Sequence, residues 1–292
     1  MLKGSIVALV TPFDKQNRVD EERLRYLVDW HIEHNTDAIL VCGTTGECAT
    51  LTPREHRVVV DIAVGQAAKR APVIAGCGAN CTQEALDLTA EAKDAGADYA
   101  LIITPYYNKP TSEGLYRHFK KISDTVDIPV IIYNVPSRTG CNISPEVVSR
   151  LYKDCRNIVG IKEASGSLDQ ITRLMGLVDD NFLLFSGSDE ITLPILSVGG
   201  VGVISVVANI APQETHNLVD SFLRGDIKEA RRLQVYFYNL IKALFWETNP
   251  IPVKAAMGLM KLCNPSVRLP LWEMSQDNLR RLSNLLGDYG MI

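Results

Sequence analysis

One short apolar run of this chain ends in a lysine whose position suits carbonyl chemistry. Residues 158–161 read Ile-Val-Gly-Ile, and Lys162 follows them. A buried parallel strand is apolar throughout, and α/β barrel enzymes act at the C-terminal ends of such strands. An amine partly withdrawn from water loses some preference for its charged form and can attack a carbonyl to give a Schiff base. The alternative is a lysine whose head reaches water past the strand end, and Lys162 alone fits that interpretation slightly better.

Two other segments carry groups that suit the same chemistry. Residues 43–47 read Gly-Thr-Thr-Gly-Glu, so Thr44, Thr45 and flexible glycine backbone predict a small anion site. Tyr133 ends another apolar run and offers a phenol that can move a proton to and from an amine adduct. Arg138 offers a planar guanidinium that can bind a carboxylate through two parallel hydrogen bonds. Taken separately, these features also fit an ordinary turn, a strand-end tyrosine and a surface arginine.

A third segment predicts a contact with another subunit. Residues 104–110 place Tyr106 and Tyr107 between two prolines, which makes a stiff, protruding aromatic loop. Exposed aromatic side chains in such a loop are typical of interfaces. The alternative is a loop anchored on its own core.

Together these groups favour one reaction type. An amine, a phenol, an anion pocket and a second carboxylate clamp suit a small α-keto acid held as an imine. The imine would tautomerise to an enamine that attacks a second carbonyl compound. We expect no metal and no organic cofactor, because the protonated imine is itself the electron sink.

The elements that must position these residues alternate along the chain. Short β-branched runs are followed by longer charged segments with helical spacing. This pattern predicts a (β/α)8 barrel, with a doubly wound open sheet as the weaker alternative because no G-x-G-x-x-G follows the first strand. The predicted strands are residues 5–9, 38–41, 73–75, 99–103, 130–133, 159–162, 183–186 and 201–204.

After residue 206 the strand pattern stops and a helical appendage is expected. One helix begins at Ala211-Pro212, and further helices are predicted over residues 226–245, 252–262 and 275–286. We therefore divide the chain into a barrel, residues 1–224, and a C-terminal helical region, residues 225–292.

Composition argues against several function classes. The net charge is −4 and no basic run occurs, so nucleic acid is not an expected partner. No stretch predicts a membrane span, and the N-terminus lacks the pattern of a signal peptide. Seven cysteines without paired spacing indicate reduced thiols and a cytoplasmic location, and the five histidines form no metal motif.

Several distant motifs resemble those of one enzyme family. Residues 43–47, 104–107, 133–140, 161–163 and 249–254 are similar, in order and spacing, to the dihydrodipicolinate synthase family. That family belongs to the N-acetylneuraminate lyase superfamily of class I aldolases. The resemblance runs essentially end to end, and it implies a homotetramer built as a dimer of tight dimers.

The resemblance also implies roles for the residues in the motifs. Lys162 would form the Schiff base with pyruvate, and Thr44 and Thr45 would hold its carboxylate. Tyr133 would be the central proton-transfer residue, linked to Thr44 and to Tyr107. The tyrosine at position 107 would reach in from the neighbouring subunit.

The second substrate implied by the resemblance is L-aspartate-4-semialdehyde. Arg138 would bind its carboxylate, and backbone at Gly187 and Ile204 would line the pocket. The reaction would stand at the branch point into diaminopimelate and lysine synthesis. Sugar-acid lyases of this fold lack the matching arginine. Their substrates bring hydroxyls to that position, and an uncharged polyol would not offset the cost of burying a guanidinium.

The resemblance further implies inhibition by L-lysine at the tight dimer interface. Glu84 would pair with an ammonium of lysine, and Tyr106 would bridge towards Tyr107. Cys48 stands where a serine is usual and Pro53 where a histidine is usual, which favours weaker inhibition. The residues that match the inhibited pattern are Ala49, His56, Asn80, Glu84 and Tyr106.

Three rival interpretations remain open from the sequence. One is a lyase of the same fold that cleaves N-acetylneuraminate or a keto-deoxy sugar acid. Another is a non-catalytic sensor of pyruvate or an amino acid. The third is a phosphate-binding barrel that uses the glycines at residues 199–202, although these also suit a strand packed at a tight barrel corner.

Overall fold

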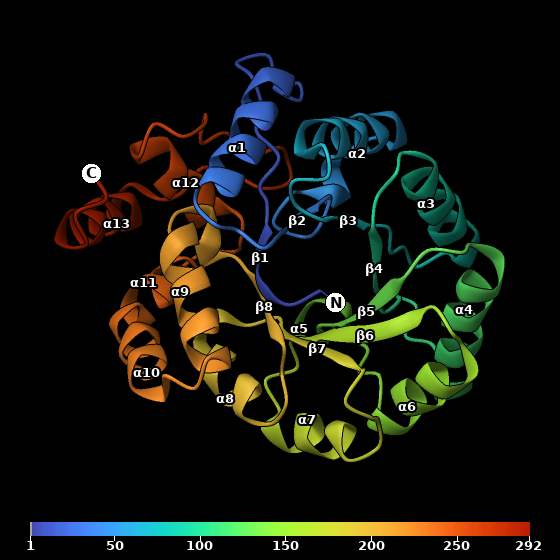
Figure 1. Ribbon diagram of the computed structural model, residues 1–292. Helices are drawn as coiled ribbons and strands as arrows, with labels where there is room; N and C mark the ends of the chain where they lie inside the picture. Colours follow the sequence, from blue (N-terminus) through green and yellow to red (C-terminus); the bar gives the residue numbers. More distant parts are fainter. Residues whose placement is uncertain (1) are drawn as a thin grey trace.

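Eight parallel strands close into a barrel in the computed structural model, which describes residues 2–292 (Figure 1). Each strand pairs with its sequence neighbours, and β1 pairs with β8 to complete the ring. The predicted barrel is confirmed and the open sheet is wrong. The strands are β1 Gly4–Ala8, β2 Ala38–Val41, β3 Val73–Gly76, β4 Tyr99–Ile103, β5 Val130–Asn134, β6 Ile158–Glu163, β7 Leu183–Ser186 and β8 Gly202–Ser205.

Helices surround the barrel and follow the strands in turn (Figure 1). One of these helices begins with a reciprocal cap: the Thr52 side chain accepts from the backbone N–H of Glu55, and the Glu55 side chain accepts from that of Thr52. The helices of the barrel are α1 Glu21–Glu33, α2 Pro53–Ala67, α3 Thr82–Asp94, α4 Ser112–Thr125, α5 Pro136–Thr139, α6 Pro145–Asp154, α7 Leu168–Met175, α8 Thr192–Ser197 and α9 Pro212–Leu223.

Side chains from alternate strand positions fill the barrel interior. They form one buried cluster that includes Ile6, Leu40, Ile131 and Phe185, while a second, larger cluster lies between the strands and the helices. A Cβ at Gly202 would lie 2.1 Å from the backbone oxygen of Gly4, so this glycine is needed where β1 and β8 meet. The packing explains the glycine at the start of β8 without a phosphate ligand.

Four helices follow the barrel: α10 Ile227–Tyr236, α11 Tyr238–Ala243, α12 Ile251–Leu259 and α13 Gln276–Asp288. The single helix predicted over residues 226–245 is wrong, because the chain breaks its helical geometry at Phe237 (φ −82°, ψ −2°). The buried Phe237 ring stacks on Tyr289, the residue after α13, with the ring centroids 5.6 Å apart, so a tertiary contact overrides local helix propensity. We propose that residues 225–292 form a region distinct from the barrel.

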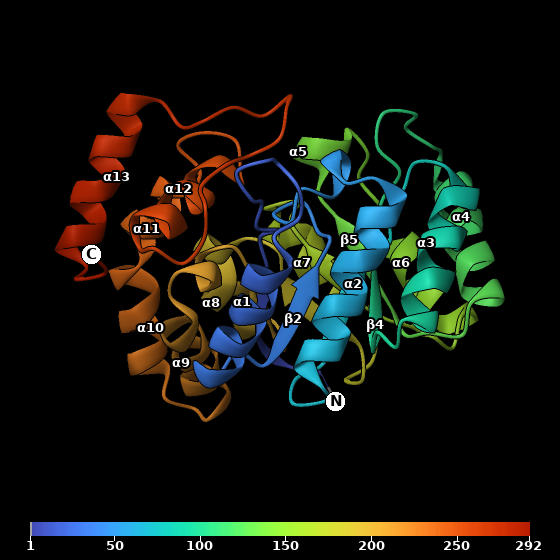
Figure 2. The same ribbon diagram turned by 90° about the horizontal axis from the view of Figure 1, so that it is seen from above.

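The two ends of the barrel differ in what covers them. Figure 2 shows α5 and the chain between α12 and α13 at one end, and the N-terminus at the opposite end. The described residues include no helix long and apolar enough to cross a membrane. All seven cysteines are free, and only Cys48 and Cys81 are exposed.

Candidate functional site

Lys162 and Tyr133 lie opposite each other on adjacent strands. They are register partners in β6 and β5, so their side chains project to the same side of the sheet. The lysine Nζ lies 4.4 Å from the centroid of the tyrosine ring. Lys162 is 6% exposed and Tyr133 is 7% exposed. The interpretation of Lys162 as a residue that extends its head into bulk water is therefore wrong.

Burial makes Lys162 a better nucleophile than an ordinary lysine. Desolvation lowers its pKa from 10.5 to about 8, and the positive charge of Arg138 adds to the lowering. Asp189 opposes it, since a nearby carboxylate favours the ammonium. At pH 7 about one molecule in ten then carries a neutral amine, far more than at the ordinary pKa.

The lowered pKa predicts a pH dependence for the attack on a carbonyl. Only the neutral amine is nucleophilic, so kcat/KM for the keto acid should rise about tenfold per unit between pH 6 and 7 and level off above about pH 8. The measurement is kcat/KM from pH 6 to 9.5 in buffers of constant ionic strength. A flat profile, or a rise that continues to pH 9.5 without levelling off, would contradict the assignment of Lys162 as the nucleophile.

Tyr133 is held in its protonated form beside this amine. Burial raises the pKa of its phenol, although the positive charge of Arg138 and a hydrogen bond with the Thr44 side chain oppose that rise. The phenol therefore carries its proton at neutral pH and can donate it to an oxygen on the carbon that the amine attacks.

Gly187 lies against Lys162, and Ile204 lies inside the barrel. The Gly187 N–H donates to the Glu163 carbonyl at 2.7 Å, and a Cβ there would lie 3.2 Å from the lysine Cγ and 2.7 Å from Ala164 Cβ. Glycine thus leaves room for the lysine stem at the end of β7. Ile204 is 1% exposed and belongs to the cluster inside the barrel.

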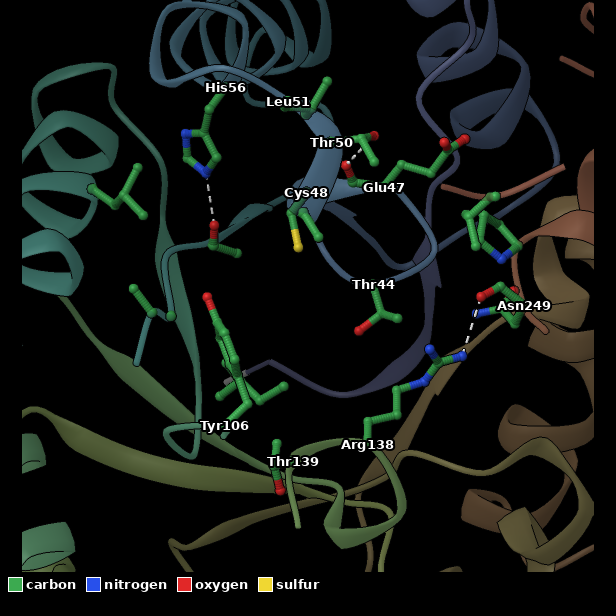
Figure 3. Close-up of a pocket in the computed structure, with 18 of the residues that line it drawn as sticks. Thr44, Glu47, Cys48, Thr50, Leu51, His56, Tyr106, Arg138, Thr139 and Asn249 are labelled. Carbon is green, nitrogen blue, oxygen red and sulfur yellow. Dashed lines mark hydrogen bonds between the residues drawn. The ribbon is translucent and has the colours of Figure 1, made fainter. Parts of the chain in front are cut away.

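Thr45 and Arg138 are joined by Asn249, a residue of the C-terminal region. Figure 3 shows Asn249 beside Arg138. Asn249 donates from Nδ2 to Thr45 Oγ1 at 3.0 Å, and its backbone oxygen accepts from Arg138 Nη2 at 3.1 Å. Thr44 and Arg138 line a cavity of about 450 Å³. Thr44 connects this cavity to the buried pair, because its hydroxyl lies close enough to the Tyr133 phenol to lower the pKa of that group.

Sequence reasoning assigned no role to Asn249. It stands 204 residues from Thr45, and no local pattern reports so distant a contact. The only available signal was its place at the start of residues 249–254, a segment already similar to the family motif. The structure adds it to the site as the residue that ties together the two groups expected to bind carboxylates.

The positions matched to the lysine-inhibition pattern also gather in one place. Ala49, His56, Glu84 and Tyr106 line the same cavity as Thr44, and so do the two departures from the pattern, Cys48 and Pro53. Figure 3 shows His56, Cys48 and Tyr106 around this cavity. Burial raises the pKa of Tyr106, and the charge of Glu84 adds to that rise. Asn80 does not line the cavity, but its backbone lies close enough to the Tyr106 phenol to lower the pKa of that group. Within one chain, the candidate regulatory residues share a cavity with Thr44 and Arg138, whereas Lys162 and Tyr133 do not line it.

Tyr107 lies apart from these residues. Its side chain is 88% exposed, its φ is 71°, and it does not line the cavity. A left-handed backbone is uncommon for a bulky residue and here points the ring into solvent. The single chain does not bring Tyr107 to Tyr133, so the expected contact between them requires a second subunit.

Possible metal ligands are not clustered in the part of the chain that the structure describes. No three His, Cys, Asp or Glu side chains among residues 2–292 stand where they could hold one ion.

The chain resembles known proteins along its whole length. Residues 1–288 match the Dihydrodipicolinate synthetase family model. A 4-hydroxy-tetrahydrodipicolinate synthase of Geobacter sp. (strain M21) is 53% identical over 100% of both chains. The chloride-inhibited dihydrodipicolinate synthase from Acinetobacter baumannii, solved with pyruvate, is 45% identical with a TM-score of 0.97 over 100% of both chains. The enzyme from Cyanidioschyzon merolae, solved with lysine bound, is 38% identical with a TM-score of 0.96 over 100% of this chain and 99% of that one.

Proposed function

This chain belongs to the dihydrodipicolinate synthetase family, and we propose that it condenses pyruvate with L-aspartate-4-semialdehyde to give 4-hydroxy-tetrahydrodipicolinate. That reaction is the first committed step of diaminopimelate and lysine biosynthesis. The observation that carries the proposal is the buried Lys162 amine, with a pKa lowered to about 8, lying 4.4 Å from the ring of Tyr133. Such an amine can form a Schiff base at neutral pH.

The reaction follows from what these groups can do. The neutral Lys162 amine attacks the ketone carbon of pyruvate, and Tyr133 donates a proton to the oxygen that leaves as water. The resulting imine loses a methyl proton and becomes an enamine, whose carbon attacks the aldehyde of the second substrate. The amino group of that substrate then displaces Lys162 at the former ketone carbon and closes the ring. We propose that this sequence uses no metal or organic cofactor.

The remaining roles in the proposal concern binding. Thr44 and Thr45 hold the carboxylate of pyruvate, and Arg138 binds that of the semialdehyde, with Gly187 and Ile204 lining the pocket. Tyr107 reaches the relay of a neighbouring subunit in a homotetramer built as a dimer of dimers. Its 88% exposure supports a role at such an interface. Seven free cysteines support a reducing compartment, so we propose that the enzyme acts in the cytoplasm.

The specificity conferred by Arg138 can be tested by its removal. Replacing Arg138 with alanine should lower kcat/KM for L-aspartate-4-semialdehyde about 100-fold, because a charge-assisted, two-point hydrogen bond to its carboxylate is lost. Pyruvate should still be trapped on Lys162 by borohydride. The assays are run at pH 9, since Arg138 also lowers the pKa of Lys162.

The exposed Arg156 serves as the matched control, and its change to alanine should leave kcat/KM as it is. Two results would contradict the proposal. One is an unchanged kcat/KM in Arg138→Ala. The other is faster turnover of N-acetylneuraminate than of pyruvate with the semialdehyde by the unaltered protein.

We also propose feedback inhibition by L-lysine at Glu84 and its neighbours. The carboxylate of Glu84 and the phenol of Tyr106 line the cavity and offer partners to an ammonium group. Millimolar L-lysine should inhibit the unaltered enzyme, and Glu84→Thr should remove that inhibition. Replacement of the exposed Glu113 by threonine should leave the inhibition in place. Flat activity of the unaltered enzyme across millimolar lysine would refute the proposal.

A further inference from the structure

The loop that carries Thr44 and Thr45 ends in an unusual backbone conformation. Glu47 has φ 53° and ψ 37°, the left-handed region that few residues other than glycine adopt. Its N–H donates to the Thr44 carbonyl at 3.1 Å and closes the turn. Such a conformation persists only where the surrounding structure holds it, and it is often found at functional sites.

The Glu47 side chain is held entirely inside the protein. Lys254 of α12 donates from Nζ to Oε1 at 2.6 Å, and the side chains of both residues are fully buried. The other carboxylate oxygen, Oε2, accepts from the backbone N–H of Arg268 at 3.0 Å. Lys254 stands 207 residues from Glu47, so the C-terminal region fixes the end of a barrel loop.

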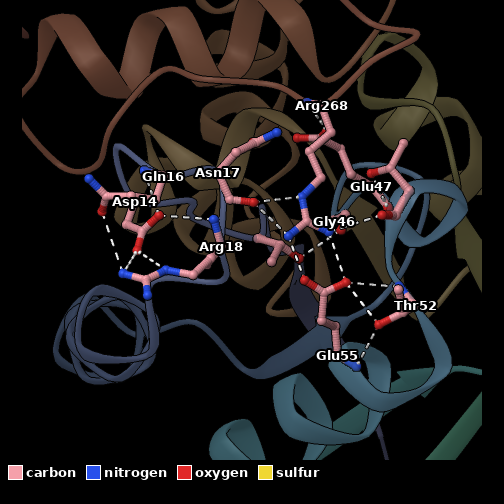
Figure 4. A network of polar contacts seen from close by, with 11 residues as sticks. Asp14, Gln16, Asn17, Arg18, Gly46, Glu47, Thr52, Glu55 and Arg268 are labelled. Atoms are coloured by element: carbon pink, nitrogen blue, oxygen red, sulfur yellow. Dashed lines mark hydrogen bonds and ion pairs between the residues drawn. The ribbon is translucent and has the colours of Figure 1, made fainter.

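Arg268 extends this attachment to the neighbouring segments (Figure 4). Its Nη2 lies 2.5 Å from Oε1 of Glu55 at the start of α2, and it also donates to the carbonyl of Asn17. Its guanidinium lies 4.2 Å from the centroid of the Phe13 ring, and Lys254 Nζ lies 4.1 Å from the same centroid. The start of α2, the loop after β1 and residues 43–47 are thus connected through one pair of cations.

Stability alone does not account for this ion pair. Moving two charges out of water is costly, and replacing a buried pair by apolar side chains of similar volume is often neutral or stabilising. What the pair supplies is a fixed direction for the Glu47 carboxylate, and with it a fixed turn two residues after Thr45. We propose that the Glu47–Lys254 ion pair is a positioning element that holds Thr44 and Thr45 in the geometry that binds the carboxylate of pyruvate. This inference rests on the proposed function of those threonines.

The test replaces the ion pair by uncharged side chains of similar shape. In the double variant Glu47→Gln/Lys254→Met, the glutamine can still accept from the Arg268 N–H. We expect KM for pyruvate to rise at least about tenfold, KM for the semialdehyde to change less than about twofold, and the unfolding temperature to stay within about 4 °C. Thr45→Val should cost less in this background than in the unaltered enzyme, because the two changes act on the same contact.

The control removes an exposed ion pair in the same way, with Asp220→Asn/Arg224→Met on α9 and the turn after it. It should leave both KM values unchanged. An unaltered pyruvate KM in the Glu47→Gln/Lys254→Met protein would overturn the proposal, whatever its unfolding temperature. If that protein is also less stable, both KM values are measured at a temperature at which it is fully folded: a raised pyruvate KM there supports the proposal and an unchanged one overturns it.

Failure of the positioning role can be told apart from failure of the proposed function. Borohydride trapping of pyruvate on Lys162 in the unaltered protein tests the function by itself. Suppose that pyruvate is trapped on Lys162 in the unaltered protein, and that the double variant reaches half-maximal trapping at the same pyruvate concentration as the unaltered protein. Only the positioning role is then overturned.

Discussion

Replacing Lys162 with alanine should reduce kcat by a factor on the order of 10⁴ or more, the scale of loss seen when a covalent nucleophile is removed. The amine is the only group in the site that can form the imine, and no neighbouring side chain is placed to substitute for it. The other buried lysine among the described residues, Lys254, is paired with Glu47 at 2.6 Å and is not free to react. The measurement is steady-state turnover of pyruvate with L-aspartate-4-semialdehyde, with unfolding temperature recorded in parallel.

The matched control for this change is Lys228→Ala, which removes an exposed lysine on α10. It should retain full activity. Lys162→Ala should remain folded, because it removes a buried amine whose desolvation is unfavourable. A folded Lys162→Ala protein that keeps more than about a tenth of the activity would contradict the covalent mechanism.

The second large effect is expected at Tyr133. Changing it to phenylalanine keeps the ring beside the lysine but removes the proton that the buried, protonated phenol can donate. The loss of a positioned general acid and base should lower kcat by about 10² to 10⁴. Pyruvate should still form the imine with Lys162, because the phenol does not take part in the attack of the amine. The imine should form more slowly, because the phenol assists the loss of water that follows.

Proton exchange provides a second test of the role of Tyr133. Exchange of the pyruvate methyl protons with deuterated water should slow together with kcat, since both steps pass through the enamine. Tyr152→Phe provides the control, because its hydroxyl bonds Asp179 at the surface and should not influence either rate. Unchanged exchange in Tyr133→Phe would show that another group moves the proton.

The sequence predicted the parts of the site that depend on local pattern. Lys162 and Tyr133 each end an apolar run, and parallel strands bring their C-terminal ends to one edge, so their meeting follows from the strand pattern alone. The strands at 38–41, 99–103 and 183–186 were predicted to the residue for the same reason. The loop of Thr44 and Thr45 was predicted from its glycines, which mark a tight turn at a strand end.

The parts that the sequence did not predict depend on contacts between distant segments. Asn249 reaches Thr45 across 204 residues, and Lys254 reaches Glu47 across 207, and neither separation leaves a local pattern. The break at Phe237 likewise follows from its stacking on Tyr289, which local helix propensity does not encode. Tyr107 depends on a second subunit, so its expected role stays a prediction.

The most direct test of the account is the identity of the atom that binds pyruvate. The protein is incubated with pyruvate and borohydride, digested, and the peptides are sequenced by mass spectrometry, with Lys162→Ala treated in parallel. The account predicts one reduced pyruvate on the Nζ of Lys162 and none on the variant. An unmodified Lys162, or an adduct on Lys254 or any other lysine, would contradict it.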